Sequence, residues 1–231
     1  MVGAPGYVAL AGVRGEIGIG TMKARIVRGR LQYIRAILQG GRKLINKVWD
    51  EMELGRGKFM ESTRKYCSWV GIEVEELRRI SRNELKGLIA GVQDRIWKEE
   101  LGRKVTLELY RTYKTEMEQE DSYDGRPDST IWFRARTNCL RLGDRNRHLG
   151  GEVSCFMCRE GTEDLEHFIL DCRELEGIRT GLTRLQRPRI ENPKEILGEF
   201  LYGKEKKRGR DELYKLWCER ERRRKALEAD S

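Results

Sequence analysis

Apolar residues recur at helical spacing along most of the chain, beginning at Thr21. From that residue they fall near every third or fourth position, with basic side chains around them. The pattern predicts a basic amphipathic helix that ends at Gly40 and Gly41, then a second helix that is interrupted at Gly55 and Gly57. The positions concerned are Met22, Ile26, Ile34, Ile37 and Leu38, the basic Lys23, Arg25, Arg28, Arg30 and Arg35, and then Leu44, Ile45, Val48, Trp49 and Met52.

The clearest helix signal begins at Ser81. With Glu84 three residues later, Ser81 has the form of a capping box, in which each side chain accepts a backbone N–H at the start of a helix. It opens the longest periodic segment of the chain, which predicts a helix. Its apolar positions are Leu85, Leu88, Ile89, Val92, Ile96 and Trp97, and the aromatic core material ahead of it is Phe59, Tyr66 and Trp69.

A polar, acidic and turn-rich run at residues 116–127 predicts a boundary. After it, Ile131, Ala135, Cys139 and Leu142 fall on one helical face. The glycine-rich start lacks periodicity. The sequence therefore predicts a mainly α protein, with helices on both sides of this boundary.

Composition adds a preference for polyanions. Apolar residues make up 38% of the chain and charged residues 37%, which favours solvated helices around thin cores. The net charge is +9 and the isoelectric point is near 9.3. The basic excess favours a nucleic acid as partner.

Six cysteines would suit a disulfide framework in a secreted protein. The start of the chain, however, has no basic region followed by a long apolar one, and no apolar run approaches the ~20 residues that span a bilayer. We therefore expect reduced thiols, no membrane partner and an intracellular location, in the nucleus, the cytoplasm or both.

Four potential metal ligands follow one another at the spacing C-x2-C-x8-H-x4-C: Cys155, Cys158, His167 and Cys172. A tight C-x2-C turn brings two thiolates to one ion. Thr162 is a suitable N-cap for a short helix that carries His167, with Leu165, Phe168 and Ile169 as the small core behind the metal. Five residues are about 140° off-face on an α-helix, so the helix should tighten or stop before Cys172.

Two plainer interpretations are free thiols with a surface histidine, and a redox pair. Neither accounts for His167 and Cys172. Three thiolates and one imidazole leave no position for water, so we expect one structural zinc ion and no hydrolytic chemistry. The predicted architecture is therefore a helical segment followed by a small zinc-stabilised CCHC knuckle and a charged helical tail. The expected divisions are an irregular N-terminus at 1–20, a helical region at 21–120, a zinc-binding domain at 128–187 and a basic, charged tail at 188–231.

Of the remaining candidates, Cys139 should be buried, and Cys67 and Cys218 have no assigned role. His148 is a competing metal ligand in principle, but its place in a run of arginine and glycine favours a phosphate contact or an inert surface position.

The stretch from Ile131 to Cys172, IWFRARTNCLRLGDRNRHLGG and then CFMCREGTEDLEHFILDC, resembles the zinc-binding region at the carboxyl end of reverse transcriptases from insect non-LTR (LINE-like) retrotransposons. The matching features are an arginine-bearing helix that runs into LRLGDRNRH, the C-x2-C pair, an acidic pair before LEHF, and the last cysteine. A weaker similarity at RGEIGIGTMKARIVRGRLQYIRAIL is to the helical stretch after the polymerase thumb. The resemblance implies the same four zinc ligands.

The polymerase itself does not carry over. Those enzymes hold two metal ions with an Asp-Asp pair, and this sequence contains no adjacent aspartates. The resemblance therefore implies a carboxyl-terminal portion of such a protein, which is not itself a catalyst. The remainder of the reverse transcriptase is a further expected partner.

A row of arginines precedes the knuckle and suits a phosphate backbone: Arg134, Arg136, Arg141, Arg145 and Arg147. Trp132, Phe133 and Phe156 could stack on the bases of a single-stranded target. For the aromatic residues we prefer the alternative, in which Trp132 and Phe133 are part of the core. Two basic clusters near the end, at residues 204–210 and 220–225, fit either a nuclear-import or polyanion signal or a salt-bridged helix. We expect a non-catalytic fragment that binds RNA template or target DNA; the alternatives are a zinc-stabilised protein-interaction module and an inactive remnant.

Overall fold

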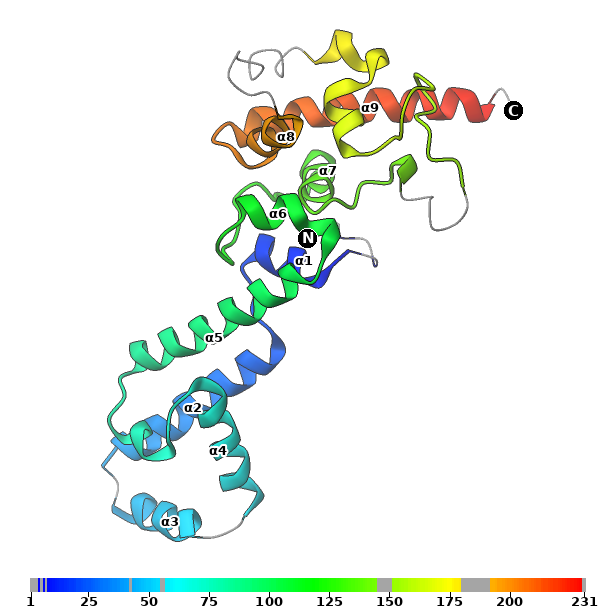
Figure 1. The fold of residues 1–231 in the computed structure, drawn as a ribbon. Coiled ribbons are helices and arrows are strands. Elements are labelled where there is room, and N and C mark those ends of the chain that lie inside the picture. The colour runs from blue at the N-terminus through cyan, green and yellow to red at the C-terminus, as the bar shows by residue number, and fades with distance from the viewer. Residues whose placement is uncertain are drawn as a thin grey trace. The chain divides into compact units, whose positions relative to one another are not determined.

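The computed structural model describes residues 4, 6, 8–41, 43–54, 57–144, 151–179 and 192–229. Within these ranges the protein is helical, and the only extended pairings are isolated bridges between Ile17 and Gln119 and between Ser154 and Thr162. This confirms the predicted mainly α class, with a cysteine-histidine cluster after a helical segment and a helix at the C-terminal end. The chain divides into two compact units, Ile19–Glu100 and Met1–Gly18 together with Leu101–Ser231 (Figure 1).

The first of these, the α2–α5 unit (Ile19–Glu100), is built from four helices and one 3-10 turn. They are α2 (Met22–Gln39), α3 (Lys43–Leu54), α4 (Lys58–Val70), η1 (Val74–Arg78) and α5 (Arg82–Gly102), whose last residues pass into the other unit. The side chain of Thr21 caps α2 by accepting from Ala24 N. The predicted capping box is also formed, since Ser81 N donates to Glu84 and Glu84 N to Ser81 Oγ.

The apolar faces of these helices enclose one core. It includes Ala24, Val27, Leu31, Ile34, Met60, Leu77, Leu85 and Ile89. Trp49 and Cys67 are buried in it, and Tyr66 and Trp69 pack against it. Helix α2 is basic and amphipathic, as predicted, but its buried face consists of Ala24, Val27, Leu31, Ile34 and Leu38. The assignment of Met22 and Ile26 to the apolar face is wrong, because both side chains are exposed.

The second unit, the CCHC unit (Met1–Gly18 and Leu101–Ser231), contains the cysteines and histidine of the motif. Its elements are α1 (Leu10–Ile17), η2 (Val105–Leu107), α6 (Glu108–Tyr113), α7 (Pro127–Arg136), the π-helical turn η4 (His167–Asp171), η5 (Arg173–Ile178), α8 (Pro193–Tyr202) and α9 (Lys206–Ala229). Helices α8 and α9 pack against α7, and η5 packs against α9. One hydrophobic core, from Ile131 to Leu216, joins these elements to the metal motif.

The structure corrects the expectation of an irregular N-terminus, because Leu10–Ile17 is helical. Small residues conceal this helix in the sequence, since they give no apolar periodicity. They are needed for close packing: a Cβ on Gly12 would lie 3.0 Å from Thr137 Cγ2. Glu16 at the end of the same helix is fully buried.

The expected divisions also differ from the observed units. The boundary between the units falls at Glu100 and not in the acidic run, because Glu120 of that run is bound inside the CCHC unit. The tail is not a separate solvated helix either. Leu213 and Leu216 of α9 are fully buried in the core that also contains Trp132 and Phe168.

Candidate metal centre

The first two cysteines lie in a short hairpin. Ser154 and Thr162 form an antiparallel β-bridge. Cys155 N donates to Gly161 O at 3.1 Å, and Arg159 N donates to Cys155 O at 2.7 Å. The turn closes only because Arg159 and Gly161 adopt left-handed backbone angles, with φ of 59° and 63°. The C-x2-C segment is thereby folded into the tight knuckle that the spacing predicts.

The short helix that follows begins two residues later than expected. Thr162 was predicted as its N-cap, but Thr162 is engaged in the bridge with Ser154. Asp164 performs the capping instead: its carboxylate accepts from His167 N at 2.8 Å, and its carbonyl accepts from Phe168 N. The correction follows from the hairpin, which uses the backbone around Thr162 before a helix can start.

His167 and Cys172 are brought to one face by a widened helical turn. We expected the helix to tighten or stop before Cys172, and the structure shows that it widens into the π-helical turn η4. Cys172 N donates to His167 O at 2.8 Å, a bond between residues five apart. A π turn contains more residues than an α turn, so residues five apart come closer to one face and the angular mismatch of an α-helix is reduced. Single π turns of this kind are frequent at functional sites.

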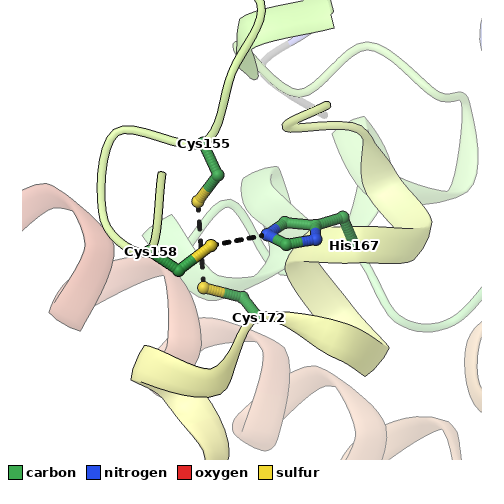
Figure 2. A group of neighbouring side chains, drawn as sticks. All are labelled: Cys155, Cys158, His167 and Cys172. Atoms are coloured by element: carbon green, nitrogen blue, oxygen red, sulfur yellow. Dashed lines mark hydrogen bonds between the residues drawn. The ribbon is translucent and has the colours of Figure 1, made fainter. Parts of the chain in front are cut away.

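All four side chains converge on one point (Figure 2). Cys155 Sγ lies 3.8 Å from Cys172 Sγ, and Cys158 Sγ lies 3.3 Å from His167 Nε2. The four ligand atoms are within 4.8 Å of one another. Tetrahedral zinc with bonds of ~2.3 Å to sulfur requires sulfur atoms about 3.8 Å apart. The side chains therefore fit a tetrahedral ion of the size and softness of zinc.

The sulfur atoms are prepared to bind a cation. A hydrogen bond from the Cys172 thiol lowers the pKa of Cys155 to about 4, against the opposing effect of burial, and raises the pKa of Cys172. Backbone N–H groups of Cys158 and Met157 lower the pKa of Cys155 further. This hydrogen bond therefore favours the thiolate form of Cys155, and a cation bound by both sulfur atoms would replace the proton of Cys172.

The packing behind the cluster is larger than the small core that the sequence suggested. Leu165, Phe168 and Ile169 are buried there, as predicted, but they continue into the core formed by α7, α8 and α9. Phe168 meets Trp217 of α9 edge-on, with ring centroids 6.2 Å apart. The knuckle is therefore one wall of a helical unit.

Three residues that support the site were missed at the sequence level. Arg220 of α9 binds both carboxylate oxygens of Glu163, just after the hairpin, at 2.8 and 2.9 Å. Arg179 donates to the carbonyl oxygen of the ligand Cys172 at 2.6 Å. Sequence offered no signal for them, because Arg220 lies in a run of alternating charges and its partner is 57 positions away.

The other sulfur and imidazole candidates stay outside the cluster. Cys139 is buried, as predicted, with its sulfur 3.1 Å from Thr137 Oγ1. Cys67 is buried in the α2–α5 unit, and Cys218 is exposed on α9. His148 lies outside the described residues.

The arginine row is divided by the structure. Arg141 is exposed, Arg134 is half-buried on α7, and Arg145 and Arg147 lie outside the described residues. The prediction that Arg136 contacts nucleic acid is wrong, because its side chain is buried among the protein's own acids. The preferred core interpretation of Trp132 and Phe133 is confirmed, since both are fully buried. Phe156 is half-buried, with the Arg220 guanidinium 5.2 Å from its ring.

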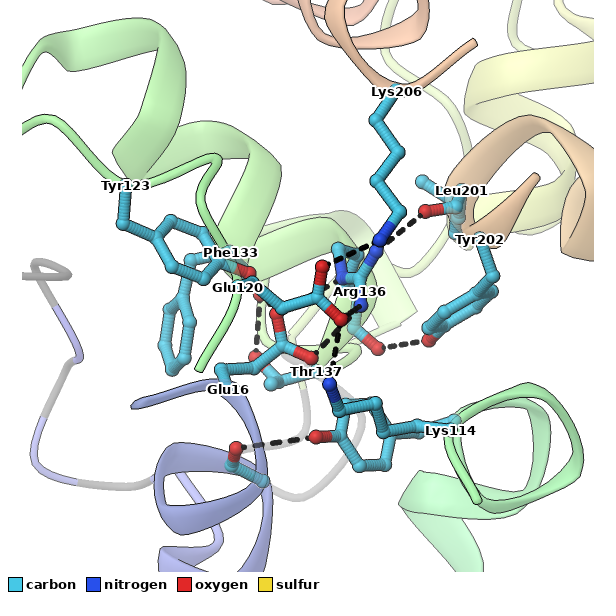
Figure 3. Close-up of polar contacts among 12 residues, drawn as sticks. Glu16, Lys114, Glu120, Tyr123, Phe133, Arg136, Thr137, Leu201, Tyr202 and Lys206 are labelled. Carbon is cyan, nitrogen blue, oxygen red and sulfur yellow. Dashed lines mark hydrogen bonds and ion pairs between the residues drawn. The ribbon is translucent and has the colours of Figure 1, made fainter. Parts of the chain in front are cut away.

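Arg136 is the centre of a buried ion-pair network (Figure 3). Its guanidinium binds Glu16 at 3.0 Å and Glu120 at 3.1 Å, and donates to Leu201 O at 2.9 Å. Lys114 and Lys206 each reach Glu120 at 2.6 Å. This network connects α1, α7, α8 and α9 within the CCHC unit, so Arg136 serves the fold.

Many basic side chains of the C-terminal tail form ion pairs with acidic residues of the protein. Arg222 and Arg223 bind Glu219, and Arg224 binds Glu221 and Glu228. Of the two interpretations of the cluster at 220–225, the salt-bridged helix is the one observed in these contacts.

The basic excess lies mainly outside the CCHC unit. The α2–α5 unit has 18 Lys and Arg against 11 Asp and Glu, a net charge of +7 out of the chain's +9. In the part of the chain that the structure describes, no helix combines the length and the apolarity needed to cross a membrane. Comparisons with protein-family models, with curated proteins and with solved structures gave no match.

Proposed function

We propose that this chain is a non-catalytic, zinc-containing nucleic-acid-binding fragment similar to the carboxyl-terminal region of a non-LTR retrotransposon reverse transcriptase. The proposal rests on one observation, the convergence of Cys155, Cys158, His167 and Cys172 at distances that suit zinc. The same four residues are those that the sequence resemblance implies as ligands. Zinc bound there supplies structural cross-linking, and the closed ligand set provides no site for a reacting water.

In this proposal the protein's own residues position the knuckle and the nucleic acid. The hairpin, the π turn and the Glu163–Arg220 pair fix the residues around the ion on the α7–α9 framework. Arg141 is exposed just ahead of the knuckle, and an arginine there suits RNA or DNA phosphates. The fragment would hold an RNA template or a target DNA for a polymerase located elsewhere.

The near charge balance of the CCHC unit favours a second candidate, a protein-interaction module whose zinc shapes a docking surface for the rest of a reverse transcriptase. This unit has 29 basic against 27 acidic residues. Salt dependence separates the two candidates. Contacts with about five phosphates weaken binding a few hundred-fold between 50 and 200 mM salt, whereas a docking surface binds RNA and DNA poorly at any salt.

The test is titration of the zinc-loaded full chain with labelled RNA and DNA over that salt range. Replacing Arg141 and Arg145 with Gln should weaken binding, and Arg134→Gln is measured separately because that side chain is half-buried. The matched control replaces the exposed Arg103 and Lys104 of the same unit with Gln. Unchanged affinity in all the arginine variants would sink the assignment to this row, and absence of any RNA or DNA binding would sink the function.

A further inference from the structure

The strongest unassigned surface is the outer face of α2, in the α2–α5 unit. This helix contains five basic residues and no acidic one. Lys23, Arg25 and Arg28 are exposed, and none of the three forms an ion pair with a described residue. Large apolar side chains lie among them, with Met22 67%, Ile26 52% and Tyr33 65% exposed. A surface of this kind attracts a polyanion that also offers apolar contacts.

The basic residues form two edges along the helix. At about 100° per residue, Met22, Gly29, Tyr33 and Ala36 share the face opposite the buried one. Lys23 and Arg30 lie to one side of this stripe, and Arg25, Arg28 and Arg35 lie to the other. The face is therefore an uncharged stripe between two rows of positive charge.

One edge is held in place by aromatic rings of α4. Lys23 Nζ lies 5.1 Å from the centre of the Trp69 ring. The Arg30 guanidinium lies 4.4 Å from the Phe59 ring and 5.5 Å from the Tyr66 ring, and it donates to Phe59 O at 2.9 Å. These contacts limit the conformational freedom that the cations would lose on binding a phosphate.

We propose that the outer face of α2 binds in the major groove of duplex DNA. An α-helix with side chains is about 10–12 Å across, and the major groove is about 12 Å wide. A helix in this groove directs its two edges to the two phosphate backbones and its central stripe to the base edges. Gly29 has no neighbour within 4 Å of the position of a Cβ, so the stripe allows close approach. This inference rests on the proposed nucleic-acid function but moves the main contact to the other unit.

Other ligands fit the surface less well. Duplex RNA has a deep, narrow major groove that does not admit a helix. Single strands are bound by stacking successive bases on several aromatic faces, whereas this stripe offers Tyr33 alone, and Phe59, Tyr66 and Trp69 each have a cation over the ring. Insertion into an anionic membrane needs a wide apolar face, and here Gly29 and Ala36 interrupt the stripe.

The experiment measures binding of the zinc-loaded full chain to a labelled DNA duplex, to its single strand, to the matching RNA duplex and to phosphatidylserine vesicles. The first variant carries Arg25→Gln and Arg28→Gln. Its control carries Lys86→Gln and Arg95→Gln, which remove the same charge from exposed positions of α5. Loss of two phosphate contacts should lower DNA affinity on the order of 50-fold at 100 mM salt and reduce the salt slope by about two. The control should stay within about twofold.

A second pair of variants separates weaker DNA binding from a loss of folding. Gly29→Glu and Gly29→Gln have nearly the same shape, and both replace glycine by a better helix former at a position with free space. Gly29→Glu should bind DNA at least about tenfold more weakly than Gly29→Gln, because it places a negative charge between the two phosphate backbones.

The outcomes are distinguishable. If the arginine and Gly29 variants bind duplex DNA as the native protein does, or if RNA duplex, single strand or vesicles bind more tightly than duplex DNA, this inference is overturned. If only the Arg141 and Arg145 variants lose affinity, it is overturned while the proposed function stands. Loss confined to the α2 variants supports it, and a native chain that binds no nucleic acid overturns both.

Discussion

Arg220 of α9 binds the carboxylate of Glu163 with two parallel hydrogen bonds, from Nε to Oε1 at 2.8 Å and from Nη2 to Oε2 at 2.9 Å. Gly143 N donates to the same carboxylate at 2.7 Å. The side chains are only 6% and 3% exposed, and the guanidinium lies close to the rings of Phe156 and Trp217. The C-terminal helix is in this way attached to the hairpin that carries the first two cysteines.

Removing one member of this pair should therefore be costly. Arg220→Ala leaves a buried carboxylate without its partner, and we expect the free energy of unfolding to fall by about 3–5 kcal/mol. Arg220→Lys should recover only part of this loss, because an ammonium cannot make two parallel bonds. Urea unfolding of the zinc-loaded protein measures both. The control, Arg222→Ala, breaks an exposed pair with Glu219 and should cost under about 1 kcal/mol. Equal midpoints for the two alanine variants would contradict the role of Arg220.

The helices and the ligand set could be predicted because they depend on neighbouring residues. Helical periodicity, the Ser81 capping box and the order of the four ligands are local patterns, and all three are present in the structure. The N-terminal helix was missed because its packing depends on close approach of Gly12 to Thr137, far along the chain.

Long-range ion pairs limited the prediction of surface function. Arg136 resembled its neighbours in the arginine row, but Glu16, 120 positions away, holds it in the core. The same limit applied to Arg220, whose neighbours in sequence suggest a solvated helix. An arginine's own sequence context does not reveal whether a distant carboxylate is buried beside it.

Metal content tests the candidate site directly. We expect one zinc per chain, and Cys158→Ser should reduce both the metal content and the midpoint of thermal unfolding, because ligand binding and folding are coupled. The exposed Cys218→Ser is the matched control and should retain the full metal content. Cobalt substitution provides an independent readout through thiolate-to-cobalt absorption. Native metal content in Cys158→Ser, or well under one zinc in the unmodified chain, would refute the site.

The backbone of the knuckle gives a pair of predictions with opposite signs. Arg159 has a φ of 59°, a left-handed angle that glycine adopts without strain, so Arg159→Gly should stabilise the protein by up to about 1 kcal/mol. Gly161 has a φ of 63°, so Gly161→Ala should destabilise it by about 1–2 kcal/mol. Urea unfolding with saturating zinc measures both changes. If both variants changed the unfolding free energy in the same direction, the left-handed backbone angles would not determine the stability of these turns.

The buried network around Arg136 predicts a defined acid sensitivity. Burial by itself raises the pKa of Glu120, but hydrogen bonds from Lys114 and Lys206 outweigh it and lower that pKa to about 2. Because the folded pKa is below the unfolded value of about 4.3, Glu120 stabilises the fold at neutral pH by about 3 kcal/mol. This contribution is present above the unfolded pKa and is lost as the pH falls from about 4.3 to about 2.

Comparison of Glu120→Gln with the native chain isolates this effect. The native protein should be the more stable at pH 7, and the difference in unfolding free energy should shrink as the pH approaches 2. Glu16 contributes with the opposite sign, because burial raises its pKa. The charge of Glu120 also raises that pKa, so Glu120→Gln lowers the pKa of Glu16 and this change is part of the measured difference. The exposed Glu118→Gln serves as the control and should show no such trend. A constant difference between Glu120→Gln and the native chain from pH 7 to pH 2 would mean that Lys114 and Lys206 do not stabilise the Glu120 carboxylate.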